Sequence, residues 1–258
     1  MASMRLFNEL TRIEATALAP ESILLLPVGA TEQHGPHLPV GTDSFAIEHL
    51  AREAASAAAE RVPVVVAPTL PFGCSPHHVP FGGTMSLGTD TYYRVIFDLA
   101  ESLALGGWRR IAIVNGHGGN HELVQLVARD LALKHPVDCV AFSYWHPAWD
   151  ALLAEGGHHV GRAPGHAGAF ETSLVLALRP ELVREPRPHR DGSHAVDPRS
   201  AFAPYRLERN GFWNSIDGYT DSPDLGSGEA GERYLTAIAR EVSRVLVEFY
   251  RATGGATA

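Results

Sequence analysis

The chain has 258 residues, of which 45% are hydrophobic and 19% are charged, and its 21 basic and 29 acidic residues give a net charge of −8. This composition is that of an ordinary globular protein. It argues against nucleic acid as a partner, because no run of Lys or Arg exceeds a local pair such as Arg109–Arg110.

Apolar runs and cysteines narrow the setting further. The longest apolar runs, residues 23–27 and 62–67, are too short to span a bilayer, and the first residues lack the apolar segment of a secretion signal. The two cysteines, Cys74 and Cys139, are too few for a disulfide framework. We therefore expect a cytoplasmic protein with no membrane partner and reduced thiols.

Short apolar runs alternate with amphipathic stretches in the first half of the chain. The continuous apolar runs predict buried strands at residues 23–28, 62–67, 110–114 and 137–142. Helical spacing predicts helices at residues 44–60, 89–105 and 120–133, with Thr89–Asp90 and Asn120 as caps of the last two. The alternation favours an α/β fold whose mostly parallel sheet is covered by helices on both faces.

The second half of the chain is less regular. Residues 155–168 are rich in Gly and His, and residues 184–228 are rich in Pro, Asp, Ser and Gly. A long segment of this kind is typical of a lid or an oligomer contact. A last helix is predicted at residues 229–250, and residues 251–258 are expected to fray. Without a repeat or a linker, residues 1–258 are predicted to form a single domain.

The first group of polar residues follows the first predicted strand and contains Glu32, His34 and Asp43. In open α/β sheets ligands bind beyond the carboxyl ends of the strands. Extended backbone points residues i and i+2 to the same side, which brings Glu32 and His34 together. Carboxylates and imidazoles are ligands of zinc, manganese or iron. Asp43 is equally explained as a helix cap. His37 is a metal ligand, a hydrogen-bond donor to one of the ligands, or a loop residue without a role in the site.

The second group, NGHGGN, follows the third predicted strand and holds His117 between glycines. A glycine-rich phosphate loop is the alternative, but the lysine of a P-loop is missing and the GxGxxG spacing fails at His121. Glycines let the backbone approach an ion closely. The pattern therefore favours His117 as a metal ligand.

The third group contains His166 and Glu171. Glu171 opens an apolar helix, so it is either a favourable charge in the first turn or a ligand carboxylate, with His166 as a nearby proton shuttle. Three separated loops thus supply enough ligands for two ions sharing a carboxylate, and too many for one structural zinc. In the loop after the second strand, His78 is a substrate contact or a loop residue, and Cys74 a packed thiol.

Three motifs in this order, EQHGPHLP followed by TD, NGHGGN and HAGxxETS, resemble the creatininase (creatinine amidohydrolase) family over residues 24–178. The segment GYTDSPDLGSGEAGERYL resembles the C-terminal part of the family less specifically. The resemblance implies a three-layer α/β/α sandwich and a homo-oligomer, often a hexamer. It also implies two divalent ions per chain, zinc first, with manganese or iron as alternatives.

Site residues follow from the same resemblance, motif by motif. One ion would be held by Glu32, Asp43 and His117, and the other by His34, Asp43 and Glu171, with Asp43 bridging and His166 as the catalytic histidine. Creatininase has a further glutamate two residues after the NGH histidine, where this chain has Gly119. This departure leaves the first ion with fewer ligands. A glycine at this position resembles branches of the family that act on formamide-bearing pyrimidines or on the peptide precursor of a redox cofactor.

The motifs predict a metal-dependent hydrolase of an amide, cyclic amide or formamide C–N bond in a small-molecule substrate. A hydroxide bridging the ions would attack the carbonyl, because one bound metal lowers the pKa of water from 15.7 to about 7. His166 would then protonate the leaving nitrogen. Expected substrate contacts are His78, Gly118, Gly119 and Trp145, the last of which, with Trp149, is a candidate for a tryptophan that closes over substrate.

Two alternatives stay open at this point. The first is a hydrolase of a sugar-derived ketone or lactone that uses the same two ions. The second is a metal-stabilised binding or assembly protein without turnover, which would bind metal but would hydrolyse no amide.

Overall fold

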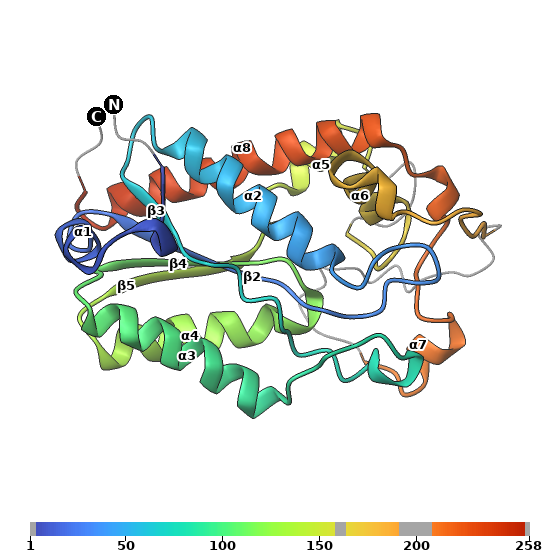
Figure 1. The fold of residues 1–258 in the computed structure, drawn as a ribbon, viewed down its shortest axis with the longest axis horizontal. Coiled ribbons are helices and arrows are strands. Elements are labelled where there is room, and N and C mark those ends of the chain that lie inside the picture. The colour runs from blue at the N-terminus through green and yellow to red at the C-terminus, as the bar shows by residue number, and fades with distance from the viewer. Residues whose placement is uncertain (1–3, 158–163, 191–207, 256–258) are drawn as a thin grey trace.

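A five-stranded parallel sheet forms the centre of the molecule, with helices on both faces (Figure 1). The computed structural model describes residues 4–157, 164–190 and 208–255. The strands stand in the order β1-β3-β2-β4-β5 and are Arg5–Leu6 (β1), Ile23–Val28 (β2), Val64–Val66 (β3), Arg110–Asn115 (β4) and Asp138–Ser143 (β5). The predicted three-layer α/β/α fold is confirmed.

Each face of the sheet has its own hydrophobic core. Strand β2 is buried along its whole length, with Ile23 and Leu25 in one cluster and Leu24 and Leu26 in the other. The two-residue period of a strand produces this alternation, and burial on both faces explains why the run is continuously apolar.

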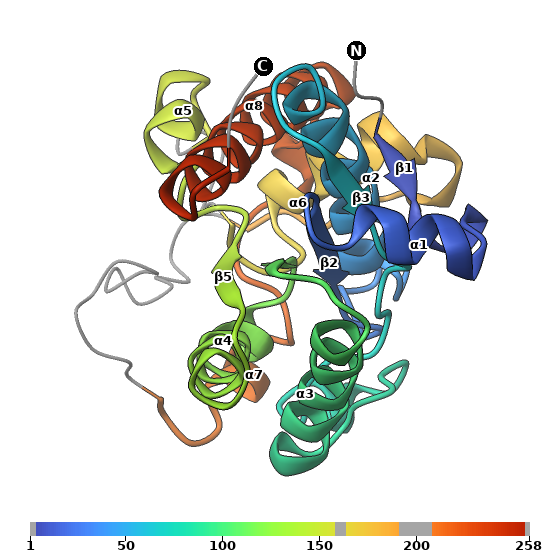
Figure 2. The same cartoon turned by 90° about the vertical axis from the view of Figure 1, so that its left-hand side faces the viewer.

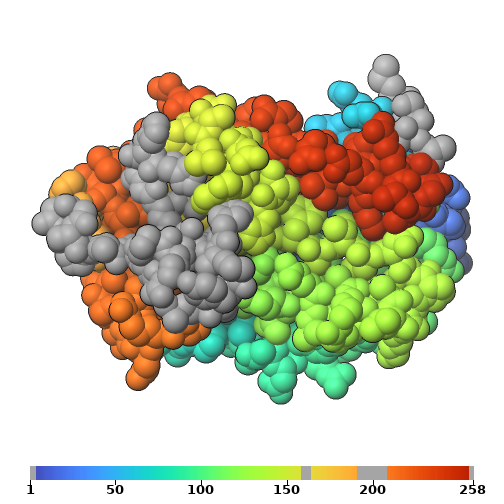
Figure 3. Space-filling model, turned by 180° about the vertical axis from the view of Figure 1, so that it is seen from behind, coloured from blue at the N-terminus to red at the C-terminus, as the bar shows by residue number. Residues whose placement is uncertain are grey.

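The helices form the two outer layers (Figure 2). The first face is covered by α2 (Thr42–Ala58), α5 (Trp149–Ala154), α6 (Ala169–Leu178) and α8 (Gly228–Ala252). The second face is covered by α3 (Thr89–Leu105) and α4 (His121–Lys134). Seen from behind, α8 runs along the upper edge of the molecule (Figure 3). Smaller elements are α1 (Arg12–Leu18), α7 (Phe212–Ser215) and the 3-10 turns Phe7–Glu9, Val79–Phe81, Gly118–Asn120, Pro180–Leu182 and Pro223–Leu225.

Most predicted elements are present, with small shifts at their ends. The strand at residues 23–28 and the helix at residues 89–105 have the predicted bounds. The strand predicted at residues 62–67 is shorter, because the N–H of Val62 still bonds to the carbonyl of Ala58 at the end of α2. Strand β1 and helix α1 were not predicted. A sequence signal for α1 exists, since Thr11 and Glu14 form a capping box.

The two predicted helix caps fare differently. Thr89–Asp90 is wrong as a cap, because α3 begins at Thr89 and its N-cap is Gly88, which has no side chain to offer. Asn120 is the N-cap residue of α4, but its side chain serves another purpose. Its Oδ1 accepts from the N–H of Cys74 (2.9 Å) and its Nδ2 donates to the carbonyl of Gly29 (3.0 Å).

Parts of the two irregular segments, residues 158–163 and 191–207, lie outside the described residues, as do residues 256–258 of the predicted frayed tail. Helix α8 continues to Ala252, and Arg110 donates hydrogen bonds to the side chain and the carbonyl of Thr253. Within the described ranges, no helix combines the length and the apolar character that crossing a membrane requires.

Candidate metal centre

The predicted metal-ligating residues come together beyond the carboxyl end of the sheet. This end of the sheet is on the right-hand side of Figure 1. Strands β2 and β4 are neighbours there, while β3 lies on the other side of β2, so the connections diverge at this point. Ligands of open α/β sheets bind at such switch points. The residues come from the loops after β2 and β4 and from the first turns of α2 and α6, and all are buried: Glu32, His34, Asp43, His117 and Glu171.

His34, Asp43 and Glu171 form one compact group. His34 Nε2 lies 3.2 Å from Asp43 Oδ1 and 3.6 Å from Glu171 Oε2. One potential ligand atom of each residue lies within 4.8 Å of the others. Three such donors converging on one point can hold a single ion.

His117 faces the other side of the same aspartate. Its Nδ1 lies 3.1 Å from Glu32 Oε1 and 3.1 Å from Asp43 Oδ2. The two oxygens of Asp43 therefore face different histidines, Oδ1 facing His34 and Oδ2 facing His117. A carboxylate in this position can bridge two ions. The alternative role of Asp43 as a helix cap does not apply, because the N-cap of α2 is Gly41.

Backbone carbonyls fix which nitrogen of each histidine faces the carboxylates. His34 Nδ1 donates to the carbonyl of Glu32 (3.1 Å), and His117 Nε2 donates to the carbonyl of Cys74 (3.2 Å), with Ser75 Oγ at 3.1 Å. When neutral, His34 thus presents the lone pair of Nε2 and His117 that of Nδ1. Outer hydrogen bonds of this kind orient the imidazoles of metal ligands.

For His34 and Asp43, the attraction between imidazole and carboxylate shifts the pKa further than burial shifts it in the opposite direction. Burial lowers the pKa of His34, but the carboxylates of Asp43 and Glu171 raise it to about 10. Burial raises the pKa of Asp43, yet His34 and His117 hold it well below its usual range. Burial raises the pKa of Glu171 to about 8, although His34 acts in the opposite direction. Protons on the histidines thus neutralise charge that a cation would otherwise neutralise.

Whether divalent ions fit this arrangement can be judged from its buried carboxylate oxygens. Glu32 is 0% exposed, and neither of its carboxylate oxygens accepts a hydrogen bond from any described residue, nor does Asp43 Oδ2. A buried carboxylate oxygen that accepts no hydrogen bond is costly, and a divalent cation would remove that cost. Oxygen and imidazole donors without a thiolate suit zinc, manganese or iron. The residues present therefore fit two divalent ions.

The ring of His166 lies beside this group, 4.4 Å from that of His34 between centroids. Its Nε2 donates to the carbonyl of Gln33 (2.9 Å), and its Nδ1 lies 3.6 Å from Glu32 Oε1. Burial and then the charge of His34 hold its pKa well below the usual value. His166 is therefore neutral, with the Nδ1 lone pair facing the carboxylates, where it can accept a proton.

His78 also belongs to the site, because its ring stacks on that of His166 with 4.0 Å between the ring centroids. Gln33 Nε2 donates to His78 Nδ1 (2.8 Å) and to the carbonyl of Gly218 (2.8 Å). The proton of His78 therefore sits on Nε2, which lies 3.8 Å from Glu32 Oε1. Burial lowers the pKa of His78 to about 3. This histidine is a neutral hydrogen-bond donor pointing into the site.

The other loop residues with open assignments have distinct positions. His37 Nε2 bonds to Thr172 Oγ1 (2.9 Å), so His37 ties its loop to α6 beside Glu171 and supports the site from behind. Glu171 Oε2 accepts from the N–H of Ala167 (2.5 Å) while facing His34. Gly118 is exposed, whereas a Cβ at Gly119 would overlap the carbonyl oxygen of Cys74.

Trp145 packs in the core rather than beside the histidines. Its side chain is 5% exposed, and its ring centroid lies 5.0 Å from that of Tyr144 in an edge-on contact. Both rings belong to the hydrophobic core on the first face of the sheet, where burial stabilises a large apolar ring. Its position gives no support to a substrate contact. A tryptophan that does face the site is Trp213 of α7, whose ring centroid lies 4.6 Å from that of His78 and 5.4 Å from that of His166.

Three residues of the site were missed in the sequence: Gln33, His77 and Trp213. Gln33 stands between two predicted ligands, and His77 directly precedes His78, so both had a signal in their neighbours. Trp213 had none, because it lies far along the chain in an irregular segment.

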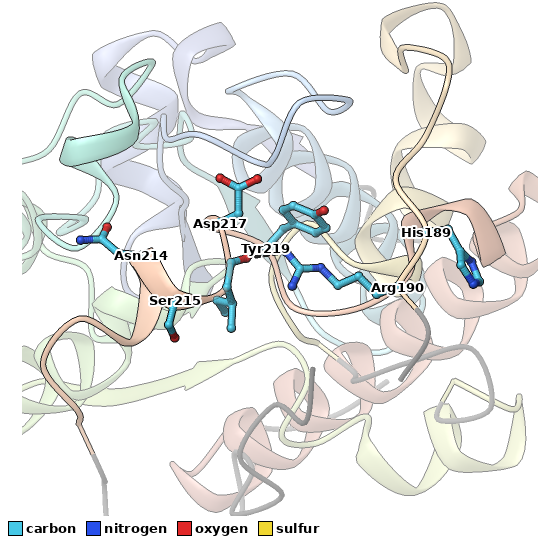
Figure 4. Close-up of a pocket in the computed structure, with 7 residues that line it drawn as sticks. His189, Arg190, Asn214, Ser215, Asp217 and Tyr219 are labelled. Atoms are coloured by element: carbon cyan, nitrogen blue, oxygen red, sulfur yellow. Dashed lines mark hydrogen bonds between the residues drawn. The ribbon is translucent and has the colours of Figure 1, made fainter. Parts of the chain in front are cut away.

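A cavity of about 500 Å³ lies beside α7 (Figure 4). It is lined by His189, Arg190, Asn214, Ser215, Ile216, Asp217 and Tyr219. None of the five predicted metal-ligating residues lines it, so it is separate from the carboxylate and histidine cluster. Its arginine is engaged by the protein, since the guanidinium of Arg190 stacks on Tyr219 at 3.7 Å and donates to the carbonyl of Ile216.

Comparisons with known proteins place the sequence and the fold in one family. The family model for creatininase (creatinine amidohydrolase) matches residues 8–246. The chain is 32% identical to a mycofactocin precursor peptide peptidase of Mycobacterium tuberculosis (strain CDC 1551 / Oshkosh), covering 86% of this chain and 83% of that protein. It is also 32% identical to a creatinine amidohydrolase of Pseudomonas putida, covering 93% and 94%. A 3-dehydro-scyllo-inosose hydrolase of Thermotoga maritima is 27% identical, covering 63% and 52%.

Solved creatininase structures share the fold over almost the whole chain. A manganese creatininase superposes with a TM-score of 0.74 and 27% identity, covering 95% of this chain and 98% of the other. A mutant creatininase of the Zn–Zn type gives 0.77 and 28%, covering 94% and 97%. The predicted resemblance is confirmed, and the chain belongs to the creatininase (creatinine amidohydrolase) family of hydrolases.

Proposed function

We propose that this protein hydrolyses an amide-type C–N bond at a centre of two divalent ions. The observation that carries this proposal is the position of Asp43, whose two oxygens face His34 and His117 separately. With Glu32 beside His117 and Glu171 beside His34, each histidine has its own carboxylate and a share in a third. One ion would be held by Glu32, Asp43 and His117, and the other by His34, Asp43 and Glu171.

Bound divalent ions would polarise a carbonyl and lower the pKa of water, which is the usual contribution of such centres to hydrolysis. Zinc is our first choice, and manganese is the alternative that the manganese creatininase supports. Iron fits the same donors. The protein itself orients the ligands, because backbone carbonyls accept hydrogen bonds from both ligand histidines, His34 and His117.

His166 would move the proton. Its Nε2–H is committed to the carbonyl of Gln33, so only Nδ1 is available toward the site. A neutral Nδ1 accepts a proton from water during attack and then returns it to the leaving nitrogen. The predicted role as proton donor is thereby refined, because His166 must first gain the proton that it gives away. His78 Nε2–H can donate to the substrate carbonyl.

The substrate class we propose is a peptide or a small peptide-like amide rather than creatinine. Two observations support it. Gly119 stands where the resemblance places a glutamate of creatininase, and Trp145 lies in the core instead of facing the site. The likeness to the precursor peptide peptidase is as strong as that to the creatinine amidohydrolase. The ketone or lactone hydrolase has less support, since that likeness covers only 52% of the relative.

A substrate panel with each metal tests the function. The purified protein, loaded with zinc, manganese or iron, is assayed with short peptides, simple amides, formamides, lactams and creatinine for released amine. We expect metal-dependent amine release from at least one amide class and the smallest rate with creatinine. Two bound ions with no release from any class would favour a binding protein and would contradict the proposal.

For the setting, we propose a cytoplasmic homo-oligomer, with the hexamer as the expected state. Family resemblance supports the assembly, and the free cysteines, Cys74 and Cys139, are consistent with a reducing compartment. Light scattering of the eluted protein would show six chains if the expectation is right, and a monomer would contradict it.

A further inference from the structure

A third histidine stands beside the ligands of the first ion. Glu32, His77 and His117 each offer one potential ligand atom, and these atoms lie within 4.8 Å of one another. The rings of His77 and His117 are parallel within 5°, with centroids 6.0 Å apart. His77 is the partly exposed member of this group, while the other two are buried.

Gly119 leaves the space in which His77 reaches this group. A Cβ at position 119 would lie 2.6 Å from His117 Nε2 and 3.2 Å from His77 Cε1, and it would overlap the carbonyl oxygen of Cys74. The backbone of Gly119 is not in the left-handed region, so glycine is needed here for space and not for its conformational freedom. A side chain at this position would meet the carbonyl of Cys74 and the ring of His117 first, and it would also crowd the ring of His77.

The loop that carries His77 is held in place from several directions. The N–H of Cys74 donates to Asn120 Oδ1 (2.9 Å), and the N–H of Ser75 donates to Ser86 Oγ (2.8 Å). The ring of His77 packs against the rings of His78 and Trp213, with centroid distances of 4.2 Å and 5.4 Å. Anchored backbone on one side and packed rings on the other give His77 the fixed orientation that a ligand needs.

We propose that His77 is an additional ligand of the first ion, joining Glu32, Asp43 and His117. This inference rests on the proposed two-ion centre. It explains how a chain with glycine at position 119 keeps a full set of donors around that ion. An imidazole adds a donor without adding charge, so three carboxylates face the two divalent ions.

The neighbouring His78 provides a contrast within the same loop. Its Nδ1 accepts a hydrogen bond from Gln33 Nε2, so its Nε2 carries the proton and has no lone pair for a metal. Both rings lie beside Glu32 and Trp213, so His78 serves as the comparison for His77 within the same loop.

Metal titration of three variants tests the assignment without relying on activity. Zinc content and affinity are measured by chelator competition for the wild type, His77→Ala, His78→Ala and His77→Glu, and cobalt-loaded samples are compared by visible absorption. We expect two ions in the wild type. In His77→Ala the first ion should bind at least about 100-fold more weakly, since even indirect supports of a metal ligand contribute 10- to 100-fold. The second ion should keep its affinity.

The other variants separate coordination from loop damage. His78→Ala should keep both ions, and His77→Glu should regain most of the affinity with an altered cobalt spectrum. Circular dichroism of the metal-free variants checks that the fold is intact. Unchanged affinity and spectrum in His77→Ala, or an equal loss in His78→Ala, would overturn this inference and leave the two-ion centre standing. A wild type without bound ions would instead overturn the proposed function.

Discussion

The carboxylates of Glu32, Asp43 and Glu171 are buried, and each lies beside His34 or His117. Proton binding by this cluster changes with pH in the metal-free protein. His34 and Glu171 both have raised pKa values, of about 10 and about 8, so each binds a proton more tightly in the folded state than in the unfolded chain. Asp43 has a lowered pKa and acts in the opposite direction at acid pH. These shifts predict how stability changes with pH.

The metal-free protein should lose stability as the pH rises. The contribution of His34 is fully present below its unfolded value of 6.5 and is lost as the pH approaches about 10, and that of Glu171 is lost as the pH passes about 8. Thermal melting with a chelator should give a Tm that falls between about pH 6.5 and about pH 9.5. Saturating zinc should remove this fall, because metal competes with the same protons. A metal-free Tm that rises over this range would contradict the assignment.

Proton transfer by His166 can be separated from metal binding. His166→Asn removes the Nδ1 lone pair beside Glu32 but none of the five proposed ligands. We expect kcat to fall by about 10²- to 10⁴-fold, the usual share of a positioned acid–base group, with both ions retained. Elemental analysis and steady-state kinetics on the same sample check this. Loss of an ion in this variant would instead make His166 a ligand, as its grouping with Glu32 and His34 allows.

At the scale of secondary-structure elements, the loops after β2, β3 and β4 are joined to one another by Asn120. This residue is 0% exposed and bonds to backbone groups of both Cys74 and Gly29. The predicted cap position was right, yet its hydrogen bonds reach two distant loops, which no local pattern in the sequence encodes. The bounds of β2 and α3 were predictable from apolar runs and helical spacing alone, whereas β1 and α1 were missed and β3 is shorter than predicted.

Replacing Asn120 should therefore loosen the whole edge of the sheet. Asn120→Ala leaves the buried N–H of Cys74 and the carbonyl of Gly29 without this partner, which should lower the free energy of unfolding by about 1–3 kcal/mol. Urea denaturation measures the change. Asn8→Ala is the matched control, since Asn8 is exposed and its replacement should stay within about 0.5 kcal/mol. Equal effects of the two substitutions would show that the bridge contributes nothing.

At the scale of the whole molecule, the site exists only because the parallel sheet brings distant loops to one edge. The motifs around Glu32, His117 and Glu171 were recognisable in the sequence, and strand-end reasoning correctly placed the first two of them at the carboxyl end of the sheet. Trp213 was not recognisable, because its contact with His77 joins segments that lie far apart in the sequence, whereas His77 had a signal in the neighbouring His78. Trp145 shows the reverse case, in which an aromatic residue near a strand end belongs to the core.

The most direct test of the two-ion centre is the metal content of the purified protein and of two ligand variants. We predict about two divalent ions per chain in the wild type. Because the proposed centre assigns His34 and Glu171 to the same ion, His34→Ala and Glu171→Ala should each lose that ion together with hydrolytic activity. Full metal content and an undiminished rate in either variant would contradict the assignment.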